Sequence, residues 1–250
     1  MRDALTMLRR DLRHLRRNPS TVFVALVVPI IMMLLFVYVF GGPAAVDHGR
    51  YLDYVVPGVL VMSIGYSVGQ TALAVSADMS EGIINRFRAM GISRAAVLTG
   101  RVLGTVLRTL VCVAIITGLT VLMGYRPHAT AAGWLTAAAF VTLAAFAAAW
   151  LTTALGLSAK TLVGASYAAF PVTFLPVVSS AFSPTSAMPA GVRAFTQHQP
   201  YTSVIETLRA ALTGAPAGHA PWIAAAWCVA VALAGYLWSR ARFTRPPRPR

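Results

Sequence analysis

Charged side chains are scarce in this chain of 250 residues. They make up 11% of it, whereas hydrophobic residues make up 57%. A soluble domain carries about 25% charged residues, so this chain cannot cover a globular surface that faces water. Acidic residues are rarest, with 7 Asp and Glu against 21 Lys and Arg. The mean hydropathy of +0.68 agrees with this balance and indicates a membrane protein.

Cysteine is also scarce, and no set of metal ligands can be recognised. The two cysteines, Cys112 and Cys228, lie far apart inside apolar runs, which excludes a disulfide framework and a cysteine-based metal site. The histidines show no His-x-x-x-His or Glu-x-x-His spacing. Four of them fall in three separate polar segments: His48, His128, His198 and His219. We therefore expect no metal site and no clustered catalytic groups.

Lysine occurs once, which decides the question of ATP hydrolysis. A phosphate-binding loop ends in Gly-Lys-Ser/Thr, but Lys160 follows Ala159, and Gly156, where the first glycine of the loop would be sought, is too close to it. The chain itself is therefore predicted to be no enzyme and to bind no cofactor.

Long apolar runs fill most of the sequence. A helix needs about 20 apolar residues to cross a hydrocarbon core of about 30 Å, and six runs meet or approach that length. The first is longer than the apolar core of a signal peptide, and no small-x-small cleavage site follows it. We expect an all-α integral membrane protein with six transmembrane helices, at Thr21–Phe40, Val55–Ala77, Val102–Met123, Ala131–Leu155, Thr161–Phe182 and Pro221–Trp238.

The arginines alternate between the polar segments. Sixteen basic residues precede the first run, follow the second and fourth, or follow the last, and four lie in the alternate segments. Such asymmetry is typical of the positive-inside rule and places both termini in the cytoplasm. The net charge of +14 first suggests nucleic acid, but membrane sidedness accounts for it, so no nucleic-acid partner is expected.

Both ends of the chain differ from the bundle. Asp3 to Arg17 places leucines at helical spacing among arginines, which predicts an amphipathic helix in the cytoplasmic interface. It is either a passive topology anchor or a docking surface for a cytoplasmic partner. We divide the single domain 1–250 into this interfacial helix (1–19), a six-span bundle (20–239) and a Pro-rich disordered cytoplasmic tail (240–250).

The segment between the second and third runs is too long for a simple turn. It covers about seventeen residues from Asp78 to Arg94, where a turn could take four. Ile83, Ile84, Phe87 and Met90 recur there at helical spacing. This pattern predicts a short amphipathic helix between Gly82 and Gly91 that presses against another surface.

Here the sequence resembles a known family. Glu81-Gly82, Arg86, Gly91-Ile92-Ser93-Arg94 and Gly100-Arg101 are similar to the cytoplasmic motif of ABC-2 type transporter permeases, in particular the daunorubicin-resistance-like drug exporters. Further matches stand at Met188-Pro189, Phe195, Gln199-Pro200-Tyr201-Thr202, Glu206 and Arg209. Two positions depart, since many relatives have proline at Gly91 and asparagine at Gln199. The resemblance covers essentially the whole chain.

The resemblance implies that the segment after span two is a coupling helix seated in a cleft of an ATP-binding subunit. The residues it assigns to coupling are Asp78, Glu81, Gly82, Arg86, Phe87, Arg88, Gly91 and Arg94. It also implies two copies of a separate ATP-binding cassette ATPase, which holds ATP and Mg. A second permease copy, identical or paralogous, completes the assembly in the bilayer of a bacterial cytoplasmic (inner) membrane. The translocation path would lie between spans one, two and five of the two copies.

The expected substrate is a hydrophobic or amphipathic drug, antibiotic or natural product. A lipid or polysaccharide precursor is the alternative cargo. An alternative of another class is a membrane interaction or sensor protein that transports nothing.

Charged and interrupting residues inside the spans predict where the bundle moves. Arg101 and Arg108 are seven apart on one helix face, with Arg108 about 10 Å deeper, and Asp78 and Glu81 are the nearest acidic candidates in sequence. Arg108 is either a buried or snorkelling ion-pair member or a transmitter of motion, and it must face protein or water. Pro171 and Pro176 should kink span five.

Two further patterns bear on gating and packing. The long segment 183–220 contains Pro200, Glu206 and Arg209 and a helical pattern over Tyr201–Ala211, so it forms either re-entrant or interfacial helices of an outer gate or an ordinary surface loop. Gly65-x-x-x-Gly69 and Gly100-x-x-x-Gly104 predict close helix approach.

Overall fold

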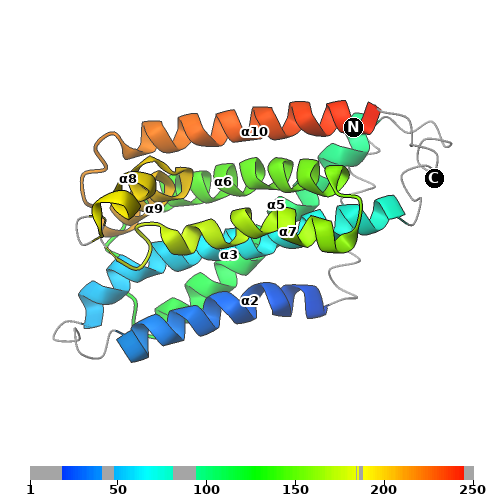
Figure 1. Cartoon of the computed structure of the whole chain (residues 1–250). Helices are drawn as coiled ribbons and strands as arrows, with labels where there is room; N and C mark the ends of the chain where they lie inside the picture. Colours follow the sequence, from blue (N-terminus) through cyan, green and yellow to red (C-terminus); the bar gives the residue numbers. More distant parts are fainter. Residues whose placement is uncertain (1–18, 41–47, 81–93, 184, 186–187, 245–250) are drawn as a thin grey trace.

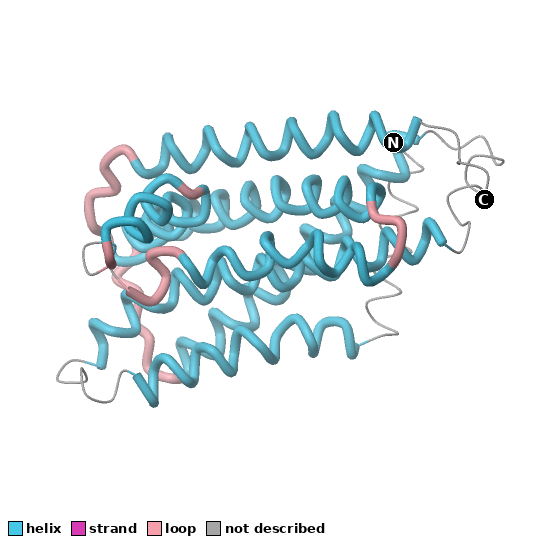
Figure 2. The backbone as a smooth tube through the Cα atoms, viewed as in Figure 1, coloured by secondary structure: helices cyan, strands magenta, loops and turns pink. Residues whose placement is uncertain are grey.

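The computed structural model describes residues 19–40, 48–80, 94–183, 185 and 188–244, and these ranges contain helices and connections but no strand (Figure 2). The predicted interfacial helix up to residue 18, residues 245–250 of the predicted tail and most of the predicted coupling segment lie outside the described residues and stay predictions. Residues 240–244 are helical, so the prediction that the disordered tail begins at 240 is wrong for them.

Long helices run side by side as one bundle, with two short helices at one of its ends (Figure 1). The order is α2 (Pro19–Leu34) continued by the π-helical turn η1 (Leu35–Phe40), α3 (His48–Ser80), α5 (Arg94–Leu122), α6 (Ala131–Ser158), α7 (Leu162–Phe174) continued by the 3-10 turn η3 (Leu175–Val178), α8 (Ala190–His198), α9 (Pro200–Thr213) and α10 (Ala220–Thr244). The beginning of α2 and the end of α10 lie at the same end of the bundle (Figure 1). The short helices α8 and α9 lie at the opposite end.

Among the described residues, four helices are long and apolar enough to cross a membrane: Tyr51–Ser80, Leu98–Leu122, Ala131–Ser158 and Ala220–Arg242. Two shorter apolar helices, Leu26–Tyr38 and Leu162–Val178, lie where spans one and five are predicted. The all-helical membrane class is therefore confirmed, while the count of six spans stays a prediction.

Span five is shorter than the apolar run that predicts it. The run continues to Phe182, but α7 ends at Phe174 and gives way to η3. Proline has no N–H, so Pro176 cannot donate the helical hydrogen bond to the carbonyl of Val172, and a 3-10 turn follows instead. Of the two prolines predicted to kink span five, Pro171 lies inside α7, and at Pro176 the interruption takes the form of an early helix end.

Helix α3 lies at the centre of the bundle. In its apolar window 78% of the residues are buried, against 17% for α10, which packs mainly on α6 and α9. Glycines on α3 let α7 and its continuation approach closely. A Cβ at Gly58 would lie 2.6 Å from the Cβ of Ala181, and one at Gly65 would lie 3.0 Å from the carbonyl oxygen of Val172. The close approach predicted from Gly65 and Gly69 is confirmed, since a Cβ at Gly69 would meet Thr173.

Candidate functional site

Three polar junctions connect α3 to its neighbours at different heights. We name them after one residue each: the Asp78 junction, the Arg108 junction and the Arg209 junction. Tyr54 and Asp78 are 24 residues apart on α3, which corresponds to about 36 Å along the helix axis. The hydrocarbon core of a bilayer is about 30 Å thick. The outer two junctions are therefore separated by roughly one membrane thickness, with the Arg108 junction between them.

The Asp78 junction joins the end of α3 to the beginning of α5. The Nη1 atom of Arg101 lies 3.0 Å from the Oδ2 atom of Asp78, and both side chains are partly exposed. An exposed ion pair of this kind contributes about 0 to 1 kcal/mol, so the pair adds little to stability and its effect is to hold the two helix ends next to each other. The pair connects the two helices on either side of the segment predicted to be the coupling helix.

The Arg108 junction lies one heptad deeper on the same two helices. Stepping seven residues back from Asp78 reaches Thr71, and stepping seven on from Arg101 reaches Arg108. The Nη2 atom of Arg108 donates to the carbonyl oxygen of Ser67 at 2.8 Å and to Oγ1 of Thr71 at 3.1 Å. Antiparallel helices bring such positions together because seven residues make nearly two full turns of each.

Buried hydroxyls extend the Arg108 junction. The hydroxyls of Thr71 and Thr105 lie 2.9 Å apart, and Thr109 donates to Oγ of Ser67 at 2.8 Å. The Ser67 carbonyl and the Thr71 hydroxyl that accept from Arg108 belong to this set of polar groups, and their hydrogen bonds offset part of the cost of placing a charge in the bundle. Arg108 was expected to face protein or water, and it contacts protein. Asp78, one of the two acidic candidates suggested for it, pairs with Arg101.

Side chains of α8 and α9 bind carbonyls where α7 breaks. Tyr201 donates its hydroxyl to the carbonyl oxygen of Val172 at 2.9 Å, the group that Pro176 leaves without a helical donor. The carbonyl of Val178 accepts from Nε2 of Gln199 and from Oγ1 of Thr196. Irregular backbone at membrane depth must be satisfied by protein or water, and here protein supplies the donors.

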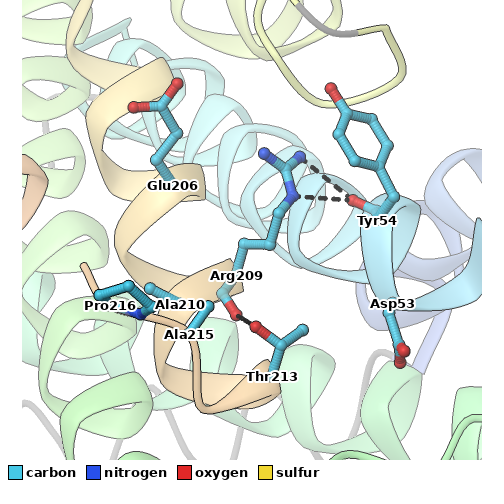
Figure 3. Close-up of a pocket in the computed structure, with 8 residues that line it drawn as sticks. All are labelled: Asp53, Tyr54, Glu206, Arg209, Ala210, Thr213, Ala215 and Pro216. Atoms are coloured by element: carbon cyan, nitrogen blue, oxygen red, sulfur yellow. Dashed lines mark hydrogen bonds between the residues drawn. The ribbon is translucent and has the colours of Figure 1, made fainter. Parts of the chain in front are cut away.

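The Arg209 junction ties α9 to α3 and to the connection between η3 and α8. The Nη2 atom of Arg209 donates to the carbonyl oxygens of Ser180 at 2.8 Å and Tyr54 at 3.1 Å. Its guanidinium carbon lies 3.9 Å from the centre of the Tyr54 ring. The Tyr54 hydroxyl donates to the same Ser180 carbonyl at 3.0 Å, so both side chains bind one oxygen (the contacts to Tyr54 are drawn in Figure 3).

A pocket of about 320 Å³ opens beside the Arg209 junction (Figure 3). Its lining comes from the beginning of α3, from α9 and from the connection to α10: Asp53, Tyr54, Glu206, Arg209, Ala210, Thr213, Ala215 and Pro216. Burial raises the pKa of the Glu206 carboxyl, and the positive charge of Arg209 opposes that shift. Burial also lowers the pKa of the Arg209 guanidinium, against the opposing effects of Tyr54 and Glu206.

The predicted site residues fall into two groups in the structure. Of the coupling set, only Asp78 has a described side chain; Arg94 begins α5, and Glu81, Gly82, Arg86, Phe87, Arg88 and Gly91 lie outside the described residues. The residues predicted for gating are all described, and Pro200 is the first residue of α9. The sequence analysis did not find Tyr54 and Ser180, because both take part through backbone carbonyls, which no sequence motif reveals.

Among the described residues, no three His, Cys, Asp or Glu side chains gather as a metal site.

The fold and its junctions define a polytopic helical membrane protein in which polar contacts join neighbouring helices at several depths. The chain belongs to the ABC-2 type transporter family, whose family model matches residues 2–213. It is 28% identical over 211 residues to the daunorubicin resistance ABC transporter permease protein DrrB1 of Streptomyces coeruleorubidus, a match that covers 84% of this chain and 75% of that protein.

A second relative carries a similar name. The probable doxorubicin resistance ABC transporter permease protein DrrC of Mycobacterium tuberculosis is 28% identical over 218 residues, which covers 83% of this chain and 75% of the relative. The family resemblance found in the sequence motifs is confirmed by these matches.

Proposed function

We propose that this chain is the permease subunit of an ATP-binding cassette exporter that moves a hydrophobic or amphipathic drug, antibiotic or natural product out across the bacterial cytoplasmic membrane. The observation that carries the proposal is the family match over residues 2–213. The two relatives, both named as drug-resistance permeases, support the substrate class.

The proposed topology has six spans with both termini in the cytoplasm. The four long apolar helices are supplemented by α2 with η1 and by α7 with η3, which are short because a π-helical turn and a proline break end them. The even number of crossings fits the start of α2 and the end of α10 at one end of the bundle (Figure 1). That end also carries Arg101, Lys160, Arg240 and Arg242, as the positive-inside rule requires of the cytoplasmic side.

The proposed assembly contains two ATPase subunits and a second permease copy, identical or paralogous. ATP and Mg bind to the ATPase, and the segment from Asp78 to Arg94 docks on it. Because the Asp78–Arg101 pair joins the helices on both sides of that segment, a displacement of the segment is delivered to α3 and α5 together. At the other end of α3, the Arg209 junction holds α9 and the broken end of α7, which we assign to the outer gate.

Purification with the partner tests this function. The tagged permease, solubilised gently, is expected to bring down an ATP-binding cassette protein, and the complex is expected to hydrolyse ATP faster when an exported drug is added. Glu81→Ala or Arg86→Ala should abolish that stimulation while membrane insertion stays normal. Arg193→Gln, on exposed α8 at the opposite end, is the matched control and should keep it. Absence of any ATPase from the complex, or full stimulation in both variants, would refute the proposal.

A further inference from the structure

The pocket beside the Arg209 junction combines acidic and apolar walls. Its two carboxylates come from different helices, Asp53 from α3 and Glu206 from α9, and they lie on opposite sides of Arg209 in Figure 3. On α9 the residues Glu206, Ala210 and Thr213 follow one another at spacings of four and three, so they form one stripe of the helix. Ala215 and Pro216 continue the wall beyond the helix end.

The guanidinium of Arg209, the positive group in the pocket lining, is hydrogen-bonded to groups other than the two carboxylates. Arg209 donates its hydrogen bonds to the carbonyls of Tyr54 and Ser180 and stacks on the Tyr54 ring. Within the described residues it forms no ion pair with Glu206. Two carboxylates against one guanidinium leave a formal charge of −1 on the lining.

Glu206 is partly buried, and its environment disfavours the charged carboxylate. A carboxylate that has lost part of its hydration gains more from an incoming cation than an exposed one, because the local dielectric is lower. The lining offers further apolar surface on the same stripe, which suits the hydrocarbon part of a ligand. A volume of about 320 Å³ is within the usual range for small-molecule pockets.

We propose that this pocket binds amphipathic organic amines, with the ammonium group on Glu206, the apolar frame against Ala210, Ala215 and Pro216, and Asp53 adding negative potential. This inference rests on the proposed function in one respect, because it takes protonated amines to be a class of exported molecule. The site that they occupy lies at the end of the bundle away from Arg101. Ammonium recognition by a charge-assisted hydrogen bond should favour an amine over its neutral amide by about tenfold.

Binding of a fluorescent amine tests the site without transport. The purified full-length permease in zwitterionic phosphatidylcholine nanodiscs is titrated at pH 7.5 with monodansylcadaverine, a primary amine, and with its N-acetyl derivative, a neutral amide of nearly the same shape. The wild-type protein is expected to bind the amine about tenfold more tightly. Glu206→Gln should remove most of this preference and Asp53→Asn about half of it, while affinity for the amide stays the same.

A second variant separates pocket occupancy from charge. Ala215→Phe lies on the exposed connection after α9 and should weaken binding of both probes equally, because it fills the pocket and leaves both carboxylates in place. Arg193→Gln is the control for a charge change elsewhere at this end. An unchanged amine preference in a folded Glu206→Gln protein, or full affinity for both probes in Ala215→Phe, would overturn the proposal.

The same measurements distinguish this proposal from the function itself. A permease that copurifies with its ATPase and exports drugs, but whose amine preference does not depend on Glu206, contradicts only the site. A protein that shows the Glu206-dependent preference but has no ATPase partner contradicts only the exporter.

Discussion

Replacing Arg209 with alanine should destabilise the protein by about 3.5 kcal/mol. Each of its two short contacts to a carbonyl is charge-assisted and contributes ~1.5 kcal/mol, and stacking on Tyr54 adds ~0.5 kcal/mol. Arg209→Ala removes all three. Arg209→Lys keeps the charge but lacks the planar fork that binds two oxygens and stacks on a ring, so it should lose about half as much.

The shared carbonyl of Ser180 permits a sharper form of this test. Tyr54→Phe alone removes one hydrogen bond, worth about 1 kcal/mol, and leaves Ser180 with its bond from Arg209. Each single variant therefore leaves that oxygen one donor, but the double variant leaves it with neither. An unsatisfied buried carbonyl costs ~1 to 3 kcal/mol, so the double variant should lose about 1 to 2 kcal/mol more than the two single losses together.

The assay is the free energy of unfolding of the purified permease, measured by denaturant titration in mixed micelles. Arg193→Gln serves as an arginine replacement with no part in the junction and should stay within 0.5 kcal/mol of the wild-type protein, as about expected of a surface change. A loss below about 1 kcal/mol in Arg209→Ala would refute the assignment of the junction. Strict additivity of Arg209→Ala and Tyr54→Phe would refute the shared oxygen.

Three further predictions concern the packing and the charges. Gly58→Ala should destabilise the protein by about 1 to 3 kcal/mol and lower its unfolding temperature, because the new Cβ has no room. In the control Gly118→Ala the new Cβ has nothing within 4 Å, so no packing cost is expected, and equal effects of the two variants would contradict the close approach at Gly58. Asp78→Asn should change stability by less than about 1 kcal/mol yet abolish drug-stimulated ATPase activity by releasing Arg101, and retained stimulation would count against coupling through this pair. Because the folded-state pKa of Glu206 is raised above its ordinary value of 4.5, wild-type stability should fall as pH rises through that raised pKa, and a Glu206→Gln protein that shows the same pH profile would contradict the shift.

The membrane class and most helices could be predicted because apolar runs of about 20 residues are rare outside membrane-spanning helices. The helix ends could not be placed as well. Helix α3 begins at His48 rather than Val55, since polar turns extend a helix beyond the apolar part that marks it. Prolines predicted an interruption of span five, but the donors that satisfy the break, Tyr201 and Gln199, come from distant elements and leave no local signal.

The sequence predicts the depth of the charged side chains in the bundle better than it predicts their partners. Sequence distance along a helix gives the height of a side chain, and on this basis Arg108 was expected below Arg101. Which acidic group faces which arginine depends on the register between α3 and α5, and the intervening segment, of about seventeen residues, does not determine that register. The structure shows that Asp78 stands level with Arg101, while the deeper arginine donates to the Thr71 hydroxyl and the Ser67 carbonyl.

The three junctions on α3 have a mechanical consequence. A helix fastened to α5 at two depths and to α9 at its far end cannot slide alone, so these three helices should translate and rotate as one rigid body. Helix α10 packs on α6 and on α9, so its contact with that body runs mainly through α9. Spin labels on α3 and α9 should therefore keep a constant separation through the transport cycle.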